Sequence, residues 1–418
     1  MKKMLPSKSP SVLYVCEWFL PIIGGAGQQA LRQAKVLSKK YNILIATRLV
    51  YRAKSSETID GLPIQRFGSA MFMKNAASQN STLQDYLSGF MLFLYIIKNS
   101  HRYQLIHIHG NLENNFAAAA ILAGRLLSIP IVAKLAIHGE LLTHDENPNQ
   151  KTLTTLRRSL NPLNHFRRYL ARHCNHYIAI STTLLQELKN VGISDQNVSL
   201  IPNGINIAVI NKNTPNRYTH PNPHPNQHPP TKKPSTTNFI VVSRLARHKG
   251  ILDPLLTTWQ RHYSQNPSVS LTIVGSGEGL SSSIESDIHT FVATHNLTNV
   301  HLVGHQPDPT SYYQQADICI FPSFNEGLSN SLLEAAAFGK ICIGSNVSGT
   351  TDVLSDGQTG FLFDPHHPAD LNKKISTALA MTPAQKSTMS AKLIAHIKQT
   401  YSLDHIASQL DALYSHLL

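Results

Sequence analysis

Residues 11–47 read SVLYVCEWFLPIIGGAGQQALRQAKVLSKKYNILIAT, and this stretch decides the fold class. A short apolar run at 11–16 precedes a glycine-rich loop, a segment with helical periodicity at 28–40, and a second apolar run at 42–47. Apolar runs that alternate with helical segments predict parallel strands joined by crossover helices. We therefore expect an α/β protein that opens with a strand, helix and strand of the doubly wound type.

The same alternation continues along the rest of the chain. Further strands are predicted at 105–108, 130–136, 177–180, 198–201, 239–243, 270–275, 300–303, 318–321 and 341–344. The last segment, 405–418, is predicted to be an amphipathic helix, whose apolar side needs a surface to cover.

A composition break divides the chain into two domains. A length of 418 residues exceeds what one core usually organises. Between Asn211 and Asn238, the hydrophobic class is represented only by Tyr218, and seven prolines interrupt regular structure. Such a segment buries too little apolar surface to offset its ordering entropy. We expect domains at 1–205 and 239–400, a Pro/Asn/His-rich linker at 206–238, and a terminal helix at 401–418.

Charge is distributed unevenly between the halves. Residues 1–205 contain 23 of the 37 Lys and Arg but only 10 of the 24 Asp and Glu, whereas the remaining residues are balanced. The excess implies an anionic partner such as a phosphate-bearing substrate, a nucleic acid or a membrane surface, or else a solvated basic face.

Targeting signals and cysteines indicate the compartment. The basic start leads into a strand-like run and not into a signal-peptide core, and the longest apolar stretch, 87–97, is too short to span a bilayer. The four cysteines lack a C-x-x-C spacing, which favours buried residues in a reducing compartment. We expect a soluble or peripherally attached cytoplasmic protein.

Three loops follow predicted strands, where open parallel sheets bind ligands. Gly24 and Gly25 belong to a glycine-rich loop that allows a phosphate to approach the backbone. Arg244 and Lys249 are two cations that can neutralise a diphosphate without a metal ion. The turn GSGEG at 275–279 can pass close to a nucleotide. Each loop alone is also compatible with an ordinary turn or surface.

A fourth segment, FPSFNEGLSNSLLEAAAFG at 321–339, is the most informative. Glu326 precedes a predicted helix and Glu334 lies inside it, so their carboxylates are at most about 12 Å apart. This separation is too large for one acid/base pair but suits two polyol groups of an elongated ligand. Backbone N–H groups between Leu328 and Asn330 can face its phosphates.

Together these segments resemble the retaining, nucleotide-sugar-dependent GT-B glycosyltransferases of family four, the glycosyl transferases group 1 type. The similarity is carried by SRLARHKG (243–250), which resembles G-R-L-x-x-x-K-G, by the E-x7-E element (326–334), by IPNGIN (201–206) and by DGQTGFL (356–362). The resemblance implies two Rossmann-like domains facing across a cleft, with the last helix packed back on the first domain. Ser243, Asn206 and Asp352 depart mildly from the family pattern.

The resemblance also implies roles for individual residues. His138, in the segment AIHGE, and Glu326 are the implied catalytic residues near the donor sugar, and Glu334 would bind the ribose. The donor diphosphate would be bound by Gly24, Gly25, Arg244, Lys249, Leu328, Ser329 and Asn330.

The implied activity is transfer of a hexose-type sugar from a UDP- or GDP-sugar, with retention and without a metal cofactor. The arginines at 157, 158, 167, 168 and 172 suit a lipid-linked or envelope-glycan acceptor, such as a lipopolysaccharide or capsule intermediate, at the inner face of the membrane. The alternatives are a GT-B epimerase or phosphorylase, or a non-catalytic basic nucleotide- or nucleic-acid-binding protein. We expect no nucleic acid partner, because aromatic residues do not interleave with the basic cluster.

Overall fold

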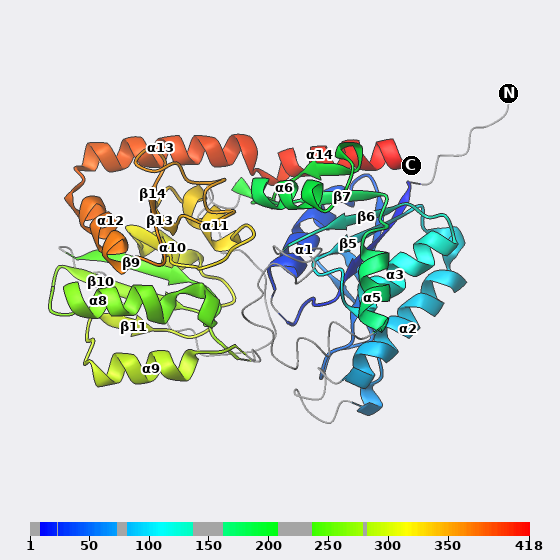
Figure 1. Cartoon of the computed structure of the whole chain (residues 1–418), viewed down its shortest axis with the longest axis horizontal. Helices are drawn as coiled ribbons and strands as arrows, with labels where there is room; N and C mark the ends of the chain where they lie inside the picture. The colour runs from blue at the N-terminus through cyan, green and yellow to red at the C-terminus, as the bar shows by residue number, and fades with distance from the viewer. Residues whose placement is uncertain (1–8, 23, 73–81, 137–161, 208–235, 279–281) are drawn as a thin grey trace. The chain divides into compact units, whose positions relative to one another are not determined.

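A computed structural model of the chain describes residues 9–22, 24–72, 82–136, 162–207, 236–278 and 282–418 (Figure 1). The chain divides into two compact units. Unit 1 comprises residues 1–204 and 403–418, and unit 2 comprises residues 205–402. Figure 1 shows that strands form the interior of each unit and that helices flank them.

Unit 1 contains an eight-stranded sheet in the order β3-β4-β2-β1-β5-β6-β7-β8. All neighbours pair in parallel except β3 and β4, which form an antiparallel hairpin. The strands are β1 (Ser11–Cys16), β2 (Asn42–Arg48), β3 (Ser56–Ile59), β4 (Leu62–Phe67), β5 (Leu105–His109), β6 (Ile131–Lys134), β7 (His176–Ala179) and β8 (Val198–Leu200).

The helices of unit 1 connect these strands. They are α1 (Gly25–Leu37), α2 (Thr82–Lys98), α3 (Asn115–Leu126), α5 (Pro162–Ala171), α6 (Thr182–Asn190) and α14 (Leu403–Leu417). Helix α2 packs on α3, and the C-terminal helix α14 packs on α1. The Tyr414 hydroxyl on α14 is hydrogen-bonded to the Tyr14 hydroxyl on β1 at 2.9 Å, so both ends of the chain share one polar contact inside the core.

Unit 2 contains a fully parallel six-stranded sheet in the order β11-β10-β9-β12-β13-β14. The strands are β9 (Thr237–Val242), β10 (Val269–Val274), β11 (Val300–Leu302), β12 (Ile318–Phe321), β13 (Ile341–Ser345) and β14 (Phe361–Phe363). The helices are α8 (Thr257–His262), α9 (Glu285–Thr294), α10 (Thr310–Gln315), α11 (Asn330–Ala337), α12 (Pro368–Ala380) and α13 (Pro383–Thr400). Its core is a cluster of buried apolar side chains around Phe239, Trp259 and Ile320.

The predicted fold class is confirmed, because each unit is built on a parallel sheet with crossover helices. Strands β1 and β12 have the predicted limits, and most others differ by one or two residues. The hairpin β3–β4 and the short strand β14 were not predicted. All four cysteines are buried and free, as expected.

Candidate functional site

The centre of the unit 2 sheet is a topological switch point. From β9 the chain builds outward through β10 and β11, and then crosses to the other side of β9 to form β12, β13 and β14. The loops after β9 and β12 therefore leave the carboxyl ends of neighbouring strands in opposite directions, which is where doubly wound sheets bind ligands. The predicted residues Arg244 and Lys249 follow β9, and Glu326 follows β12.

Glycine residues allow these loops to pack closely. Gly250 has φ +65°, and a Cβ added there would lie 1.9 Å from the carbonyl oxygen of Pro322, just after β12. Gly275 has φ +146°, and its added Cβ would lie 1.7 Å from the carbonyl oxygen of Ser243, after β9. Any side chain at either position would force the loops apart. The close approach brings the end of the 244–250 loop onto the loop after β12.

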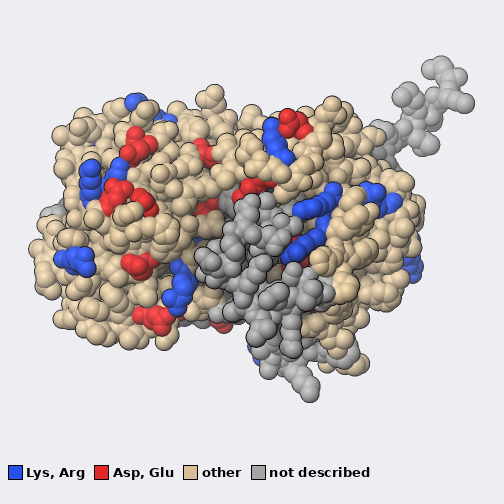
Figure 2. Space-filling model, viewed as in Figure 1, with Lys and Arg blue, Asp and Glu red and all other residues tan. Residues whose placement is uncertain are grey.

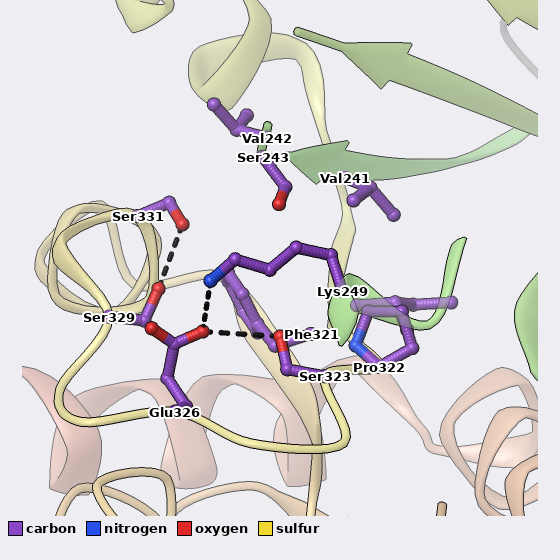
Figure 3. Close-up of a pocket in the computed structure, with 11 residues that line it drawn as sticks. Val241, Val242, Ser243, Lys249, Phe321, Pro322, Ser323, Glu326, Ser329 and Ser331 are labelled. Atoms are coloured by element: carbon purple, nitrogen blue, oxygen red, sulfur yellow. Dashed lines mark hydrogen bonds and ion pairs between the residues drawn. The ribbon is translucent and has the colours of Figure 1, made fainter. Parts of the chain in front are cut away.

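Lys249 and Glu326 form an ion pair at this junction (Figure 3). The Lys249 ammonium donates to Glu326 Oε2 at 2.5 Å, and the Ser323 hydroxyl donates to the same oxygen at 3.2 Å. The side chains of Lys249 and Glu326 are only 13% and 16% exposed, so the pair is largely removed from water. Glu326 is thus held by two donors on one oxygen, while Oε1 takes part in neither bond.

The ion pair lies in a pocket at the carboxyl ends of β9 and β12 (Figure 3). The pocket joins residues from both strands and from the start of α11. Its lining consists of Val241, Val242, Ser243, Lys249, Ile320, Phe321, Pro322, Ser323, Glu326, Ser329 and Ser331.

Helix α11 begins beside this pocket. The Ser329 hydroxyl caps the helix by accepting from Leu332 N at 3.3 Å, and it is also hydrogen-bonded to the Ser331 hydroxyl at 2.9 Å. Leu328, Ser329 and Asn330 therefore occupy the N-terminal end of α11, which carries the partial positive charge of the helix dipole. This is the end of a helix that favours an anionic ligand.

Arg244 is exposed, and its guanidinium forms no hydrogen bond or ion pair with the rest of the described chain. Burial, followed by the positive charges of Lys249 and Arg244, lowers the pKa of His248. Both cations therefore belong to the electrostatic surroundings of His248. A dianionic group at the switch point would meet two positive charges, of which Arg244 is uncompensated.

Glu334 lies one turn into α11 and is half-buried. Its Oε2 accepts a hydrogen bond from the buried Tyr313 hydroxyl at 3.4 Å. Burial and the charge of Glu334 raise the pKa of Tyr313 well above its ordinary value, so this phenol stays protonated and can donate. The same hydroxyl lies 3.3 Å from the Ser331 carbonyl oxygen, so Glu334 shares this donor with the backbone of α11.

The remaining predicted residues belong to unit 1 or lie outside the described chain. Gly24 is the N-cap residue of α1, and Gly25 is its first residue. A Cβ built on Gly24 has no heavy atom within 4 Å, so packing does not demand glycine there. His138 lies outside the described residues.

Sequence reasoning missed three side chains that hold these loops. Ser323 and Tyr313 orient the two carboxylates, and Glu285 accepts from Gly277 N at 2.7 Å and from the Ser276 hydroxyl at 3.2 Å. The signal for Ser323 was its place directly after a strand, but Tyr313 and Glu285 come from neighbouring helical segments that no motif marks. In the part of the chain that the structure describes, no three His, Cys, Asp or Glu side chains group as metal ligands would.

Two parallel-sheet units, with cations and carboxylates at the switch point of the second, define the class of GT-B glycosyltransferases. Comparison with known proteins agrees with this class. Residues 23–209 match the family model Glycosyltransferase Family 4, and residues 224–393 match Glycosyl transferases group 1. The chain belongs to the group 1 glycosyltransferases with the GT-B fold.

Individual relatives are distant. The chain is 30% identical over 183 residues to the capsular polysaccharide biosynthesis glycosyltransferase CapM of Staphylococcus aureus, covering 43% of this chain and 47% of CapM. It is 34% identical over 84 residues to the N,N'-diacetylbacillosaminyl-diphospho-undecaprenol alpha-1,3-N-acetylgalactosaminyltransferase of Campylobacter jejuni, covering 20% of this chain and 22% of that enzyme. The chain thus spans less than half the length of these relatives.

The fold is similar to that of Anabaena HepE, solved in complex with UDP and glucose. The TM-score is 0.69 at 17% identity, and the alignment covers 97% of this chain and 99% of HepE. At this identity the similarity establishes the fold alone.

Proposed function

We propose that the protein transfers a hexose-type sugar from a UDP- or GDP-sugar to a lipid-linked or envelope-glycan acceptor, with retention of anomeric configuration. The observation that carries this proposal is the junction of the β9 and β12 loops. There Arg244, the Lys249–Glu326 pair and the N-terminus of α11 come from separate segments to one end of the sheet. Membership of the group 1 family and the likeness to a UDP-binding fold support the choice of donor.

The donor diphosphate is assigned to the positive elements of this junction. Arg244 offers a fork of N–H donors, and Lys249 keeps two N–H groups besides the one that Glu326 accepts. Backbone groups at Leu328, Ser329 and Asn330 add the field of the α11 N-terminus. As the sugar leaves, charge grows on the diphosphate, and these groups stabilise it where other transferases use a metal ion.

The carboxylates are assigned to hydroxyl groups at the two ends of the donor. Glu326, fixed through Oε2, presents Oε1 to the sugar, and Glu334 receives the ribose hydroxyls. Gly24, Gly25 and His138 complete the proposed donor contacts, with the two glycines at the diphosphate and the histidine at the sugar. No protein nucleophile is invoked: the acceptor oxygen bonds to the anomeric carbon on the face from which the diphosphate departs, and the leaving phosphate takes the acceptor proton.

The acceptor is proposed from charge and from the relatives. The excess of Lys and Arg in residues 1–205 favours an anionic acceptor, and the names of CapM and the Campylobacter enzyme refer to a capsule and to a diphospho-undecaprenol. We place the protein in the cytoplasm, peripherally at the inner face of the membrane. Residues 206–238 serve in this proposal as the linker between the acceptor and donor domains.

Thermal shift with a panel of nucleotides tests the donor site. UDP, GDP, ADP and their sugars are compared on wild type, Arg244→Ala and Glu334→Ala, with the exposed Arg261→Ala at the end of α8 as a matched control. A ligand at 100 times its Kd stabilises by about 2.7 kcal/mol, so one nucleotide should raise Tm in wild type and control but not in the site variants. Unmoved melting curves with every nucleotide at millimolar concentration would remove the donor site.

Product analysis separates the alternative reactions. Transfer of the sugar to an added acceptor supports the proposal. Release of a free epimerised sugar from the nucleotide sugar alone would identify an epimerase, and phosphate-dependent cleavage of a glycan would identify a phosphorylase. Nucleotide binding without any turnover would favour a non-catalytic binding protein.

A further inference from the structure

Helix α2 presents an apolar face to solvent. Every exposed position between Leu83 and Ile97 is apolar, and the largest exposed fractions are 56% at Leu83, 60% at Phe90 and 49% at Leu94. The full set of these positions is Leu83, Tyr86, Phe90, Met91, Leu94 and Ile97. Their spacing of three or four residues places them along one side of the helix.

The buried face of α2 is distinct from the exposed apolar side. Gln84, Ser88 and Gly89 are buried, and a Cβ added to Gly89 would lie 2.7 Å from the Asn115 carbonyl oxygen on α3. Close packing against α3 therefore demands glycine at position 89, while Leu92 and Ile96 are buried further along the helix. The outer stripe leaves Leu83, Phe90 and Leu94 about half exposed or more, and an apolar stripe of this kind on a surface helix marks an interaction site.

Cationic side chains lie beside the stripe. The Arg167 guanidinium on α5 lies 5.8 Å from the centre of the Tyr86 ring, and Lys98 is exposed at the end of α2. On α5 itself, Phe166 and Tyr169 are exposed, and Arg172 is exposed directly after the helix ends. Figure 2 shows the surface over α2 largely uncharged, with Lys and Arg side chains near α5.

The acidic residues of this region are already engaged with cations. Between residues 82 and 136 they are Asp85 and Glu113. Asp85 lies 3.5 Å from Arg48, and Glu113 lies 3.3 Å from Arg168. The surface around the stripe is therefore net positive.

We propose that α2 and the exposed side of α5 form the docking surface of this protein for an anionic lipid bilayer. Apolar and aromatic side chains that insert among lipid headgroups, with Lys and Arg beside them, are the chemistry of interfacial helices. The stripe from Leu83 to Ile97 extends about 21 Å along the helix, which lies in the plane of the interface. No helix among the described residues has the length and hydropathy to span a bilayer.

The charge distribution favours a lipid surface over a second copy of the chain. A two-fold contact through α2 would place the same patch on both partners, so the cations of one copy would face those of the other. Anionic headgroups instead complement Lys98, Arg167 and Arg172. The inference rests on the proposed function in one respect, because a lipid-linked acceptor gives the enzyme a reason to reach the membrane.

Vesicle co-sedimentation at low salt tests the docking surface. The full chain is mixed with vesicles of phosphatidylcholine alone or with phosphatidylglycerol added, without nucleotide or acceptor. We expect binding to the anionic vesicles, a loss of at least about tenfold in the partition coefficient for Phe90→Asp/Leu94→Asp, and a loss of about fivefold for Arg172→Ala. Leu418→Asp, which places the same charge at a 48% exposed apolar residue outside the stripe, should bind like wild type.

The outcomes separate docking from catalysis. Wild-type protein that ignores anionic vesicles, or a stripe variant that binds them unchanged, overturns the docking surface. The docking surface is also overturned if analytical ultracentrifugation finds wild type dimeric and Phe90→Asp/Leu94→Asp monomeric, because the stripe would then serve self-association. A nucleotide thermal shift in the stripe variant shows that this variant is folded. If the protein bound vesicles but no nucleotide, the proposed function would be refuted and the docking surface would stand.

Discussion

The ion pair between Lys249 and Glu326 gives the sharpest test of the site. Lys249→Met removes the ammonium and keeps most of the side-chain length. The Glu326 carboxylate, 16% exposed, would then retain only the Ser323 hydroxyl at 3.2 Å. Breaking a largely buried pair in this way costs about 3 kcal/mol, because a charge is left without its partner. For a unit of this size that corresponds to a fall in Tm of about 6–12 °C.

A double-mutant cycle separates the pair from its two members. Glu326→Gln in the Lys249→Met background removes the stranded charge, and the amide oxygen can still accept from Ser323. We expect the double variant to recover about 2 kcal/mol relative to Lys249→Met. Nucleotide binding should be weaker than wild type in both variants, because neither has the ammonium group of Lys249.

Calorimetric unfolding and nucleotide titration provide the two readouts. In the double variant the stranded charge is gone but the cation is still missing. Stability should therefore recover while nucleotide binding does not. If the two substitutions add without coupling, the pair is not a functional unit of unit 2. If the double variant binds nucleotide like wild type, Lys249 is not a diphosphate ligand.

Three further predictions concern unit 1. Gly24→Ala should change Tm by less than about 1 °C, since an added Cβ has no neighbour within 4 Å. If a phosphate approaches the backbone there, the same Cβ should weaken nucleotide-sugar binding at least tenfold, as measured by calorimetry. Unchanged affinity would remove Gly24 from the donor site. Tyr414→Phe breaks the hydroxyl contacts to Tyr14 and His107 and should lower the free energy of unfolding by about 1–2 kcal/mol in urea titrations; an unchanged midpoint would show that this core network contributes no net stability. Burial lowers the pKa of Lys134 to about 7, so between pH 7 and 8 the folded chain releases a proton that the unfolded chain keeps. The free energy of unfolding should therefore rise by about 1 kcal/mol over this range. The difference in free energy of unfolding between wild type and Lys134→Met should show this rise, and a difference that does not change with pH would refute it.

Much of the fold could be predicted because its signals are local. The buried runs at Ser11–Cys16 and Ile318–Phe321 are bounded by turns and contain no polar residue beyond Ser11, so strand limits follow from hydropathy. The hairpin β3–β4 was missed although its turn, Asp60-Gly61, has positive φ at both residues and is a typical hairpin turn. The alternation of polar and apolar residues in its two strands is too weak to predict them from the sequence.

The site could be predicted only in its residue types. Motif spacing indicated that Lys249 and Glu326 matter, but their pairing depends on how Gly250 packs under Pro322, which no spacing encodes. The contact between Tyr14 and Tyr414 joins residues 400 positions apart and follows from tertiary packing alone.

The most direct test is a crystal structure of the protein with a bound nucleoside diphosphate from the thermal-shift panel. We predict that the diphosphate oxygens lie within about 3.2 Å of the Arg244 guanidinium, the Lys249 ammonium and the backbone N–H groups at the start of α11. A well-ordered nucleotide bound elsewhere, with none of these groups in contact with it, would contradict the proposed site.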